Sequence, residues 1–436
     1  MHFRQHFEER NHFGGINVAS GQLYCALCAD FVYDRDCEVA RRDAENAMRK
    51  RYGFSLKFVW NPARAEVERL QPLAQKENVV LRLEADTTVG LRGLINLGNT
   101  CFMNCILQAL THTPLLRDYF MSDQHRCAGK NAGRCLMCEM SRVFQEFYCV
   151  STRRPHVPSH LLHMVWTHAH HLAGYEQQDA HEFLIAALDL LHKHSRSNTI
   201  AKNDQECRCI IDRIFTGRLQ SDVTCQQCDG VSTTCDPFWD ISLDLGNIVA
   251  NTNGAGATNG GIAAGGMKSL EDCLERYTRP EHLGSSAKIE CSRCHSYEES
   301  TKQLTLQKLP IVACFHFKRF EHSSKLHKKI STYVSFPETL DMSPYTTQCR
   351  SRTQSTEPKS GTLHALAENR NRYSLFAVVN HQGTIEGGHY TCFVRQRGAD
   401  AWFKCDDHVI TRATAAEVLN SEGYLLFYHK TFIEYD

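Results

Sequence analysis

The first residue in this chain whose type and position could support catalysis is a cysteine at the expected start of a helix. Cys101 follows a glycine-containing segment, residues 90–100, and apolar residues at helical spacing begin at Phe102. Free N–H groups at a helix N-terminus favour a thiolate over a thiol. Asn96 lies in the preceding segment, and its amide could donate a hydrogen bond to a developing oxyanion. Cys101 is therefore a candidate nucleophile, although a cysteine considered alone is more often a buried core residue.

A thiol nucleophile needs a base, and one histidine has a suitable position. His389 follows two glycines, which leave room for a substrate backbone, and it precedes an expected strand at residues 390–395. The next expected strand, residues 401–406, ends in Asp406 and is followed by Asp407. Neighbouring strands would place Asp406 beside His389, where a carboxylate can orient the imidazole. The sequence leaves open whether Asp407 shares or replaces this role.

The elements that must position these groups are helices early in the chain and strands later. Apolar residues at three- and four-residue spacing predict helices at residues 102–112, 138–148, 160–172 and 179–194. Short alternating or apolar segments predict strands at residues 238–245, 311–320, 373–381, 390–395, 401–406 and 424–429. Helices segregated from an antiparallel sheet indicate an α+β domain.

The chain divides into three expected parts. Residues 1–34 are rich in His and Cys, residues 35–89 form a charged linker with some helix, and residues 90–431 carry the dense apolar patterning of a core. Two insertions within the third part are predicted to be loops. Residues 246–267 are rich in Gly, Asn and Ala, and residues 343–372 are polar and irregular.

Composition and charge restrict the function classes. Lys plus Arg and Asp plus Glu both total 49, so bulk charge argues against direct, sequence-specific binding of nucleic acid. No apolar segment reaches the length of a membrane span, and the polar N-terminus lacks the apolar part of a secretory signal. We therefore expect no membrane association and an intracellular location, where the 21 cysteines would stay reduced.

Pairs of cysteines in a reducing compartment predict bound zinc. Two C-x-x-C pairs, separated by 62 residues that include the Gly-rich insertion, would form one closed tetrahedral site: Cys225, Cys228, Cys291 and Cys294. A second set of soft ligands lies in a polar loop between two expected helices: His125, Cys127, Cys135 and Cys138. Zn²⁺ is therefore expected as a structural cofactor.

Two weaker sets of candidate ligands also occur. Cys207 and Cys209 form a C-x-C pair near His192, but the fourth ligand is open, with Asp212 as one possibility. Reduced surface cysteines beside a histidine favoured by the helix dipole explain this set equally well. The N-terminal segment offers the other set: His6, His12, Cys25 and Cys28.

Together these motifs resemble the ubiquitin-specific protease family of cysteine peptidases. The resemblance rests on residues 90–110, 174–183, 388–390, 404–407 and 423–428. It implies a papain-like fold with thumb, palm and zinc-bearing fingers, and hydrolysis of the bond after the C-terminal glycine of ubiquitin. It also implies four catalytic roles: Cys101 as nucleophile, His389 as base, Asp406 as orienting carboxylate and Asn96 as oxyanion donor. Asp179 would contact the ubiquitin tail, a role compatible with capping the following helix.

Within that family the chain resembles the histone H2B deubiquitinase subunit of the SAGA transcriptional coactivator, through residues 111–120, 236–245 and 279–288. This implies monoubiquitinated histone H2B as substrate, a location in the nucleus, and docking onto adaptor subunits of a deubiquitination module. Residues 21–34 resemble the end of the zinc finger that precedes the catalytic domain in this subfamily. Since its upstream half is not in the sequence, we expect a truncated remnant with an incomplete zinc set.

Three functions therefore stay open from the sequence. The first is an active deubiquitinase. The second is a module that binds ubiquitin or adaptors with little turnover because the finger is incomplete. The third is a scaffold in which all the thiols are structural. The presence of Cys101, His389, Asp406 and Asn96 favours the first function.

Overall fold

The computed structural model describes residues 90–432 with gaps, and a few residues before them. The gaps are residues 123, 126, 128–134, 149–153, 175, 197–206, 208, 246–267, 324–325, 353–369, 385–386 and 397–399. The earlier described residues are Ala40, Asp43, Ala44 and three short strands, β1 Gly14–Ile16, β2 Leu23–Cys25 and β3 Asp30–Val32. The chain separates into two compact units, residues 1–82 and 83–436.

In the first unit the three strands form an antiparallel sheet in the order β1–β2–β3. The candidate ligands His6, His12 and Cys28 lie outside the described residues, and only the backbone of Cys25 is described. The expected zinc set of this segment therefore stays a prediction.

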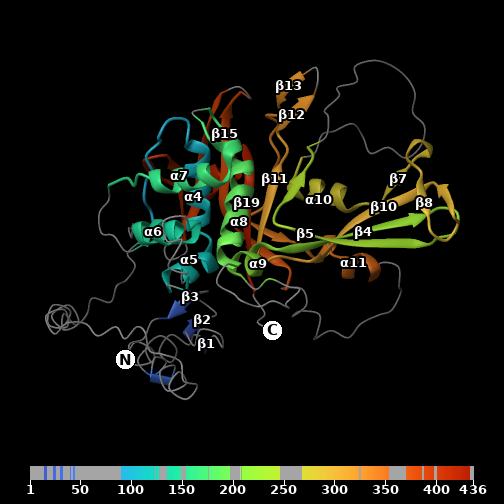
Figure 1. Ribbon diagram of the computed structural model, residues 1–436, viewed down its shortest axis with the longest axis horizontal. Helices are drawn as coiled ribbons and strands as arrows, with labels where there is room; N and C mark the ends of the chain where they lie inside the picture. The colour runs from blue at the N-terminus through green and yellow to red at the C-terminus, as the bar shows by residue number, and fades with distance from the viewer. Residues whose placement is uncertain are drawn as a thin grey trace. The chain divides into compact units, whose positions relative to one another are not determined.

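The second unit begins with helices that cover one side of a large sheet (Figure 1). In chain order they are α4 Cys101–Thr111, α5 Pro114–Met121, α6 Leu136–Tyr148, α7 Ser159–His168, the 3₁₀ turn η3 His170–Leu172, α8 Ala180–Arg196 and α9 Ile210–Phe215. In the described part of the chain, every helix is too short or too polar to span a bilayer.

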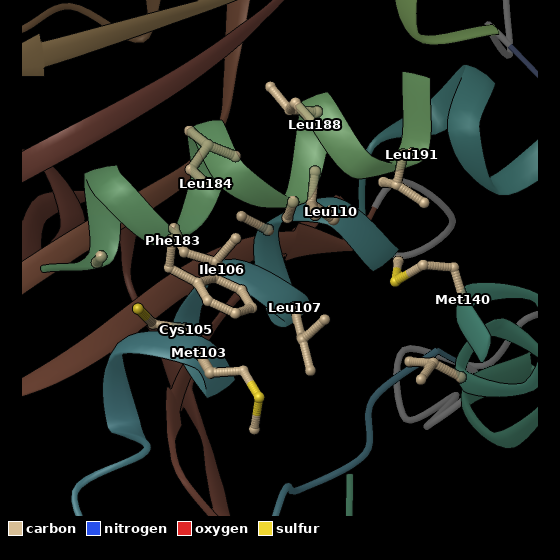
Figure 2. Packing of buried hydrophobic residues seen from close by; sticks show 14 of the residues in the cluster. Met103, Cys105, Ile106, Leu107, Leu110, Met140, Phe183, Leu184, Leu188 and Leu191 are labelled. Atoms are coloured by element: carbon tan, nitrogen blue, oxygen red, sulfur yellow. The ribbon is translucent and has the colours of Figure 1, made fainter. Parts of the chain in front are cut away.

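Helix α4 is buried on every side because it lies between α8 and the sheet. Each of its residues is buried, as expected of a helix that is apolar around much of its circumference. The side chain of Ile106 lies beside Phe183 of α8 (Figure 2), and Leu110 and Leu188 belong to the same buried cluster. Phe102 meets Phe183 of α8 edge to face, with 5.6 Å between ring centroids. This packing fixes the helix end that carries Cys101.

The large sheet has eight strands among the described residues. Its order is β18–β17–β16–β15–β19–β11–β6, and β14 pairs with β15. The strands are β6 Ile241–Leu243, β11 Val312–Phe317, β14 Thr339–Asp341, β15 Arg372–Gly383, β16 Gly388–Gln396, β17 Ala401–Asp406, β18 Val409–Ala413 and β19 Gly423–Lys430. Neighbouring strands are antiparallel except β6 and β11, which run parallel.

Both faces of the large sheet are buried. Along β19, Leu425 and Phe427 join the core under the helices, whereas Leu426 and Tyr428 join a second core on the opposite face. This alternation follows from the two-residue period of a strand. The second core also contains Leu270 of α10, a helix at Leu270–Thr278 that begins with a capping box.

A narrower antiparallel sheet extends away from the large sheet (Figure 1). Its order is β5–β4–β10–β7, formed by β4 Gly217–Cys225, β5 Val231–Phe238, β7 Glu281–Leu283 and β10 Ser300–Lys308. A two-stranded piece, β8 Ile289–Cys291 and β9 Ser296–Glu298, lies near its end. Because β4 ends at Cys225 and β8 ends at Cys291, the cysteine pairs lie at the tip of this sheet.

The remaining elements are short. They are the 3₁₀ turns η4 Ser285–Ala287 and η5 Ser343–Tyr345, the helices α11 Thr347–Arg352 and α13 Ala415–Leu419, and the hairpin of β12 Phe320–Ser323 and β13 Leu326–Lys329.

Three expectations for single elements are wrong. The predicted helix at 160–172 ends at His168, because Ala169 leaves the helical conformation before η3. The predicted strand at 238–245 is instead the end of β5, a bend and the short β6. The insertion at 343–372 is not wholly irregular, because α11 is attached to α10 by Arg350, which donates to Glu275 at 2.8 Å. The insertion at 246–267 lies outside the described residues.

The packing of α4 on α8 predicts the effect of removing one aromatic ring. Phe183 is 1% exposed and Phe432 is 52% exposed. We expect Phe183→Ala to lower the free energy of unfolding by about 3–5 kcal/mol, because it leaves a cavity against Phe102. Phe432→Ala should change it by less than about 0.5 kcal/mol. Urea unfolding followed by tryptophan fluorescence measures both, and equal shifts for the two variants would contradict this packing.

Candidate active site and zinc centres

The loop before Cys101 is fixed against the turn that follows β17. The backbone N–H of Leu94 donates to the carbonyl oxygen of Asp407 at 2.8 Å. Gly93 lies so close to this turn that a Cβ atom there would come within 2.3 Å of the carbonyl oxygen of His408, so a side chain would force the two segments apart. Segments from opposite ends of the domain therefore meet in the loop that leads to Cys101.

The structure brings His389 and Asp406 together. β16 begins next to His389 and β17 ends at Asp406, and these antiparallel neighbours place the two ends side by side. Nε2 of His389 lies 2.6 Å from Oδ1 of Asp406. An ionised carboxylate only accepts hydrogen bonds, so the proton of a neutral imidazole is on Nε2. Nδ1 is then the nitrogen that can take a proton from a thiol.

Asp407 has different partners from Asp406, because it holds two asparagine amides. Nδ2 of Asn96 donates to Oδ2 of Asp407 at 3.0 Å, and Nδ2 of Asn104 donates to Oδ1 at 2.8 Å. Oδ1 of Asn96 accepts from two backbone N–H groups of the following loop, at 3.0 and 3.1 Å. These bonds fix the direction of the Asn96 amide. One hydrogen of its Nδ2 is used by Asp407, and the second is left for an oxyanion.

Sequence reasoning missed Gln177. Its Oε1 accepts from the backbone N–H of Gly388 at 2.8 Å, and its Nε2 donates to the carbonyl oxygen of Gly388 at 2.7 Å. The same Nε2 lies 3.5 Å from Sγ of Cys101. Gln177 therefore ties the start of the strand that carries His389 to the candidate nucleophile. The sequence did contain a signal for Gln177, because this residue lies in segment 174–183, one of the segments that resemble the ubiquitin-specific protease family.

Cys101 is in an environment that favours its thiol. It is 3% exposed, and burial is the main cause that raises the pKa of Cys101 above its usual value. The negative charge of Asp407 raises this pKa further, whereas hydrogen bonds from the Tyr390 backbone and from Gln177 lower it. Among the described hydrogen bonds, none joins Cys101 to His389. A base is therefore needed to generate the nucleophile at neutral pH.

Asp179 lies at the start of α8 and is held from two sides. Its Oδ1 accepts from the backbone N–H of His181 at 2.7 Å, as a capping residue does. The hydroxyl of Tyr424 lies 2.7 Å from both carboxylate oxygens. Asp179 is partly exposed, so capping leaves lone pairs for another donor.

The four cysteines at the tip of the narrow sheet have the geometry of a zinc site. Sγ of Cys225 lies 3.9 Å from Sγ of Cys294, and Sγ of Cys228 lies 3.6 Å from Sγ of Cys291. Two sulfurs bound tetrahedrally to one Zn²⁺ lie about 3.8 Å apart, since each Zn–S bond is about 2.3 Å. Disulfide sulfurs are about 2.05 Å apart. Hydrogen bonds from the backbone N–H groups of Cys294 and Arg293 lower the pKa of Cys291 to about 6, which suits a metal ligand.

The second set of candidate ligands also converges. The ligand atoms of His125, Cys127, Cys135 and Cys138 all lie within 4.8 Å of one another. Nε2 of His125 is 3.3 Å from Sγ of Cys135. Burial and the neighbouring thiols raise the pKa of Cys138 to about 12, so several thiolates would be stable together only beside a cation. The donor set fits Zn²⁺.

The third set contains three converging ligands, His192, Cys207 and Cys209. Nδ1 of His192 lies 3.2 Å from Sγ of Cys209. Asp212 is not part of the cluster, because its Oδ1 accepts from the hydroxyl of Thr216 at 2.7 Å and its backbone N–H faces Cys209. Three protein ligands leave one position of a tetrahedral site open.

Comparison with known proteins also points to a cysteine peptidase that acts on ubiquitin. The family described as "Ubiquitin carboxyl-terminal hydrolase" matches residues 92–428. The human protein named "Ubiquitin carboxyl-terminal hydrolase 22" is 56% identical over 445 residues, which cover 100% of this chain and 83% of the relative. The human protein named "Ubiquitin carboxyl-terminal hydrolase 27" is 53% identical over 434 residues, which cover 94% of this chain and 97% of the relative.

Solved structures show the same fold. A structure of the SAGA Ubp8/Sgf11/Sus1/Sgf73 DUB module bound to ubiquitin aldehyde matches with a TM-score of 0.65 and 30% identity, covering 99% of this chain and 84% of that one. A SAGA DUB module that contains a Ubp8 variant and is bound to monoubiquitin matches with a TM-score of 0.64 and 29% identity, at the same coverage. These matches confirm the expected papain-like α+β fold. From its motifs, its fold and its relatives, the chain belongs to the ubiquitin carboxyl-terminal hydrolases, the family of ubiquitin-specific cysteine peptidases.

Proposed function

We propose that this chain removes ubiquitin from monoubiquitinated histone H2B in the nucleus, as the catalytic subunit of a SAGA-type deubiquitination module. The match to SAGA DUB modules bound to ubiquitin species supports the module and the ubiquitin ligand. The sequence resemblance described above supports histone H2B and the nucleus. Adaptor subunits corresponding to those of the solved modules would bind the chain.

The catalytic roles follow from the positions of the side chains. Cys101 attacks the carbonyl carbon of the C-terminal glycine of ubiquitin, and Nδ1 of His389 accepts the thiol proton. Asp406 holds the imidazole through Nε2 and stabilises the imidazolium that forms. The second hydrogen of the Asn96 amide donates to the oxyanion. His389 then returns its proton to the leaving amine, and water releases ubiquitin from the thioester.

Asp407 is proposed as the residue that orients the oxyanion donor rather than the base. The single observation that carries the assignment is its pair of bonds to Asn96 and Asn104. A donor that is already oriented needs no reorganisation when charge develops on the substrate oxygen. Asp179, with both carboxylate oxygens held at the N-terminus of α8, is proposed to bind a donor group of the ubiquitin tail.

Zinc is proposed as a structural ion in the two clusters of four ligands, and His192, Cys207 and Cys209 are proposed as a third, incomplete set. A structural Zn²⁺ supplies cross-links between segments that share too little apolar surface to stay together. At the tip of the narrow sheet it would join the β4–β5 turn to the β8–β9 turn. No catalytic step depends on these ions.

The direct test of the activity is release of a fluorophore from the C-terminus of ubiquitin. We expect the zinc-loaded chain to turn over, Cys101→Ala to abolish turnover and retain ubiquitin binding, and purified adaptor subunits to raise the rate. Cys105→Ala is the matched control, because Cys105 lies one turn later in α4 with its Sγ 3.0 Å from the carbonyl oxygen of Phe102. Ubiquitin binding without turnover in every condition would support the alternative, a binding module with little intrinsic activity.

Neutralising Asp407 should make the Cys101 thiol more reactive but lower the rate of turnover. The charge of Asp407 raises the pKa of Cys101, so Asp407→Asn lowers this pKa and increases the thiolate fraction at pH 8. Alkylation of Cys101 by iodoacetamide at pH 8 should become faster. Turnover should fall by about 10²–10³, the usual loss when an oxyanion donor is disturbed. Slower alkylation together with normal turnover would contradict the assigned role.

Removing one proposed ligand at the tip of the narrow sheet should release one zinc ion. We expect Cys228→Ser to contain one zinc fewer per chain than the unmodified protein, by elemental mass spectrometry, and to bind ubiquitin more weakly. Cys235→Ser is the control, because Cys235 is an exposed cysteine of β5 outside the clusters. An unchanged zinc content in Cys228→Ser would exclude this site.

A further inference from the structure

A chain of polar side chains connects the start of β6 to Asp179 through the second unit. Nε2 of His181 lies 3.0 Å from Oδ2 of Asp240, and the hydroxyl of Ser242 lies 2.9 Å from the same oxygen. The Ser242 hydroxyl also lies 2.9 Å from Nδ1 of His316. Nε2 of His316 lies 3.2 Å from the hydroxyl of Tyr424. That hydroxyl lies 2.7 Å from each oxygen of Asp179.

His181, Asp240 and His316 lie close enough to suggest a metal site, but the ring geometry argues against one. Their ligand atoms lie within 4.8 Å of one another. The rings of His181 and His316 are stacked, with centroids 3.8 Å apart and planes inclined by 17°. An imidazole lone pair lies in the plane of its ring, so two stacked rings cannot both direct a nitrogen at one ion. The contacts therefore form a hydrogen-bonded network.

The middle of the network, at His316 and Tyr424, is shielded from water. His316 is 9% exposed and Tyr424 is 1% exposed. Burial, and then the neighbouring His181, lower the pKa of His316 to about 3. Burial also opposes ionisation of Asp240, but the bonds from His181 and Ser242 outweigh it and lower the pKa of Asp240.

The hydrogen bonds fix the order of the protons. The Tyr424 hydroxyl donates to Asp179, and the Ser242 hydroxyl donates to Asp240. Because a hydroxyl has only one proton, the oxygen of Ser242 accepts from Nδ1 of His316, and Nε2 of His316 is left without a proton. Nε2 is then a second acceptor that faces the Tyr424 hydroxyl, at 3.2 Å compared with 2.7 Å for Asp179.

We propose that Tyr424, His316 and Ser242 are positioning residues for ubiquitin recognition, acting through Asp179. They hold the Asp179 carboxylate in one orientation, so that it meets a donor group of the ubiquitin tail without reorganisation. The network begins at Asp240, close to the junction of β5 and β6, so the narrow sheet and the tail-binding residue are linked through it. This inference rests on the proposed role of Asp179 in binding ubiquitin.

The test is a double-mutant cycle on ubiquitin affinity, measured in the Cys101→Ala background so that turnover does not interfere. Asp179→Asn and Tyr424→Phe are made singly and together, and binding of monoubiquitin is measured by calorimetry. Tyr428→Phe is the matched control, because Tyr428 is a buried tyrosine of the same strand whose hydroxyl binds the carbonyl oxygen of Pro337 at 2.5 Å. Thermal unfolding of each variant verifies that the fold persists.

We expect Asp179→Asn to weaken binding about 10-fold or more and Tyr424→Phe about 3-fold to 10-fold, since hydrogen bonds to charged groups are the stronger ones. The double variant should bind no more weakly than Asp179→Asn alone, because Tyr424 acts only through Asp179. Tyr428→Phe should bind like the parent. His316→Gln, whose side-chain amide oxygen can replace Nε2 as an acceptor for the Tyr424 hydroxyl, should keep most of the affinity that His316→Leu loses.

Two results would overturn this inference while leaving the proposed function intact. One is additive losses from Asp179→Asn and Tyr424→Phe, and the other is equal affinity for His316→Gln and His316→Leu. Normal affinity in Asp179→Asn would remove the role of Asp179 itself. Failure of the proposed function is distinguishable, because the unmodified chain would then release no fluorophore from ubiquitin.

Discussion

The contact between the loop before Cys101 and the turn after β17 determines the arrangement of the candidate active site. The backbone bond from Leu94 to Asp407 and the close approach of Gly93 to His408 join segments more than 300 residues apart in sequence. Since α4 is packed rigidly against α8, this contact also sets where Cys101 lies relative to the strand that carries His389. A displacement of the turn would move the base, its carboxylate and the oxyanion donor together.

The adjacent carboxylates of Asp406 and Asp407 lie at one turn but hold different groups of the site. Asp406 ends β17 and faces the imidazole, whereas Asp407 adopts a positive φ of 49° and faces the amides on the opposite segment. The left-handed conformation is unusual for a residue with a side chain but is more accessible to Asp than to most. Its position at the contact between the two segments fits the observation that backbone strain concentrates at functional sites.

Much of the fold could be predicted from the sequence because its signals are local. The apolar spacing of 102–112 and the short strands around His389 and Asp406 specify α4, β16 and β17 directly. The small helix α11 was not predicted, since it is held by contacts with distant segments such as Glu275 of α10. The candidate zinc ligands in C-x-x-C pairs could be recognised from the sequence, because the two ligands of each pair are close together in the chain.

The partners of the site residues were harder to predict than the residues themselves. The sequence contained Asp406 and Asp407 but left open which one would orient His389, because strand register does not decide which side chain turns inward at a strand end. Gln177 and Tyr424 had no assigned role, since their bonds reach across 211 and 245 residues of sequence. Such contacts appear only when the helices and the sheet are assembled.

The most direct test of the central claim is reaction with ubiquitin that carries an electrophilic C-terminus, followed by peptide mass spectrometry of the adduct. The site geometry predicts a single adduct on Cys101, formed at neutral pH although Cys101 is buried, and absent from His389→Ala. An adduct on any other cysteine, or an adduct on Cys101 that forms equally fast without His389, would contradict the assigned nucleophile and base.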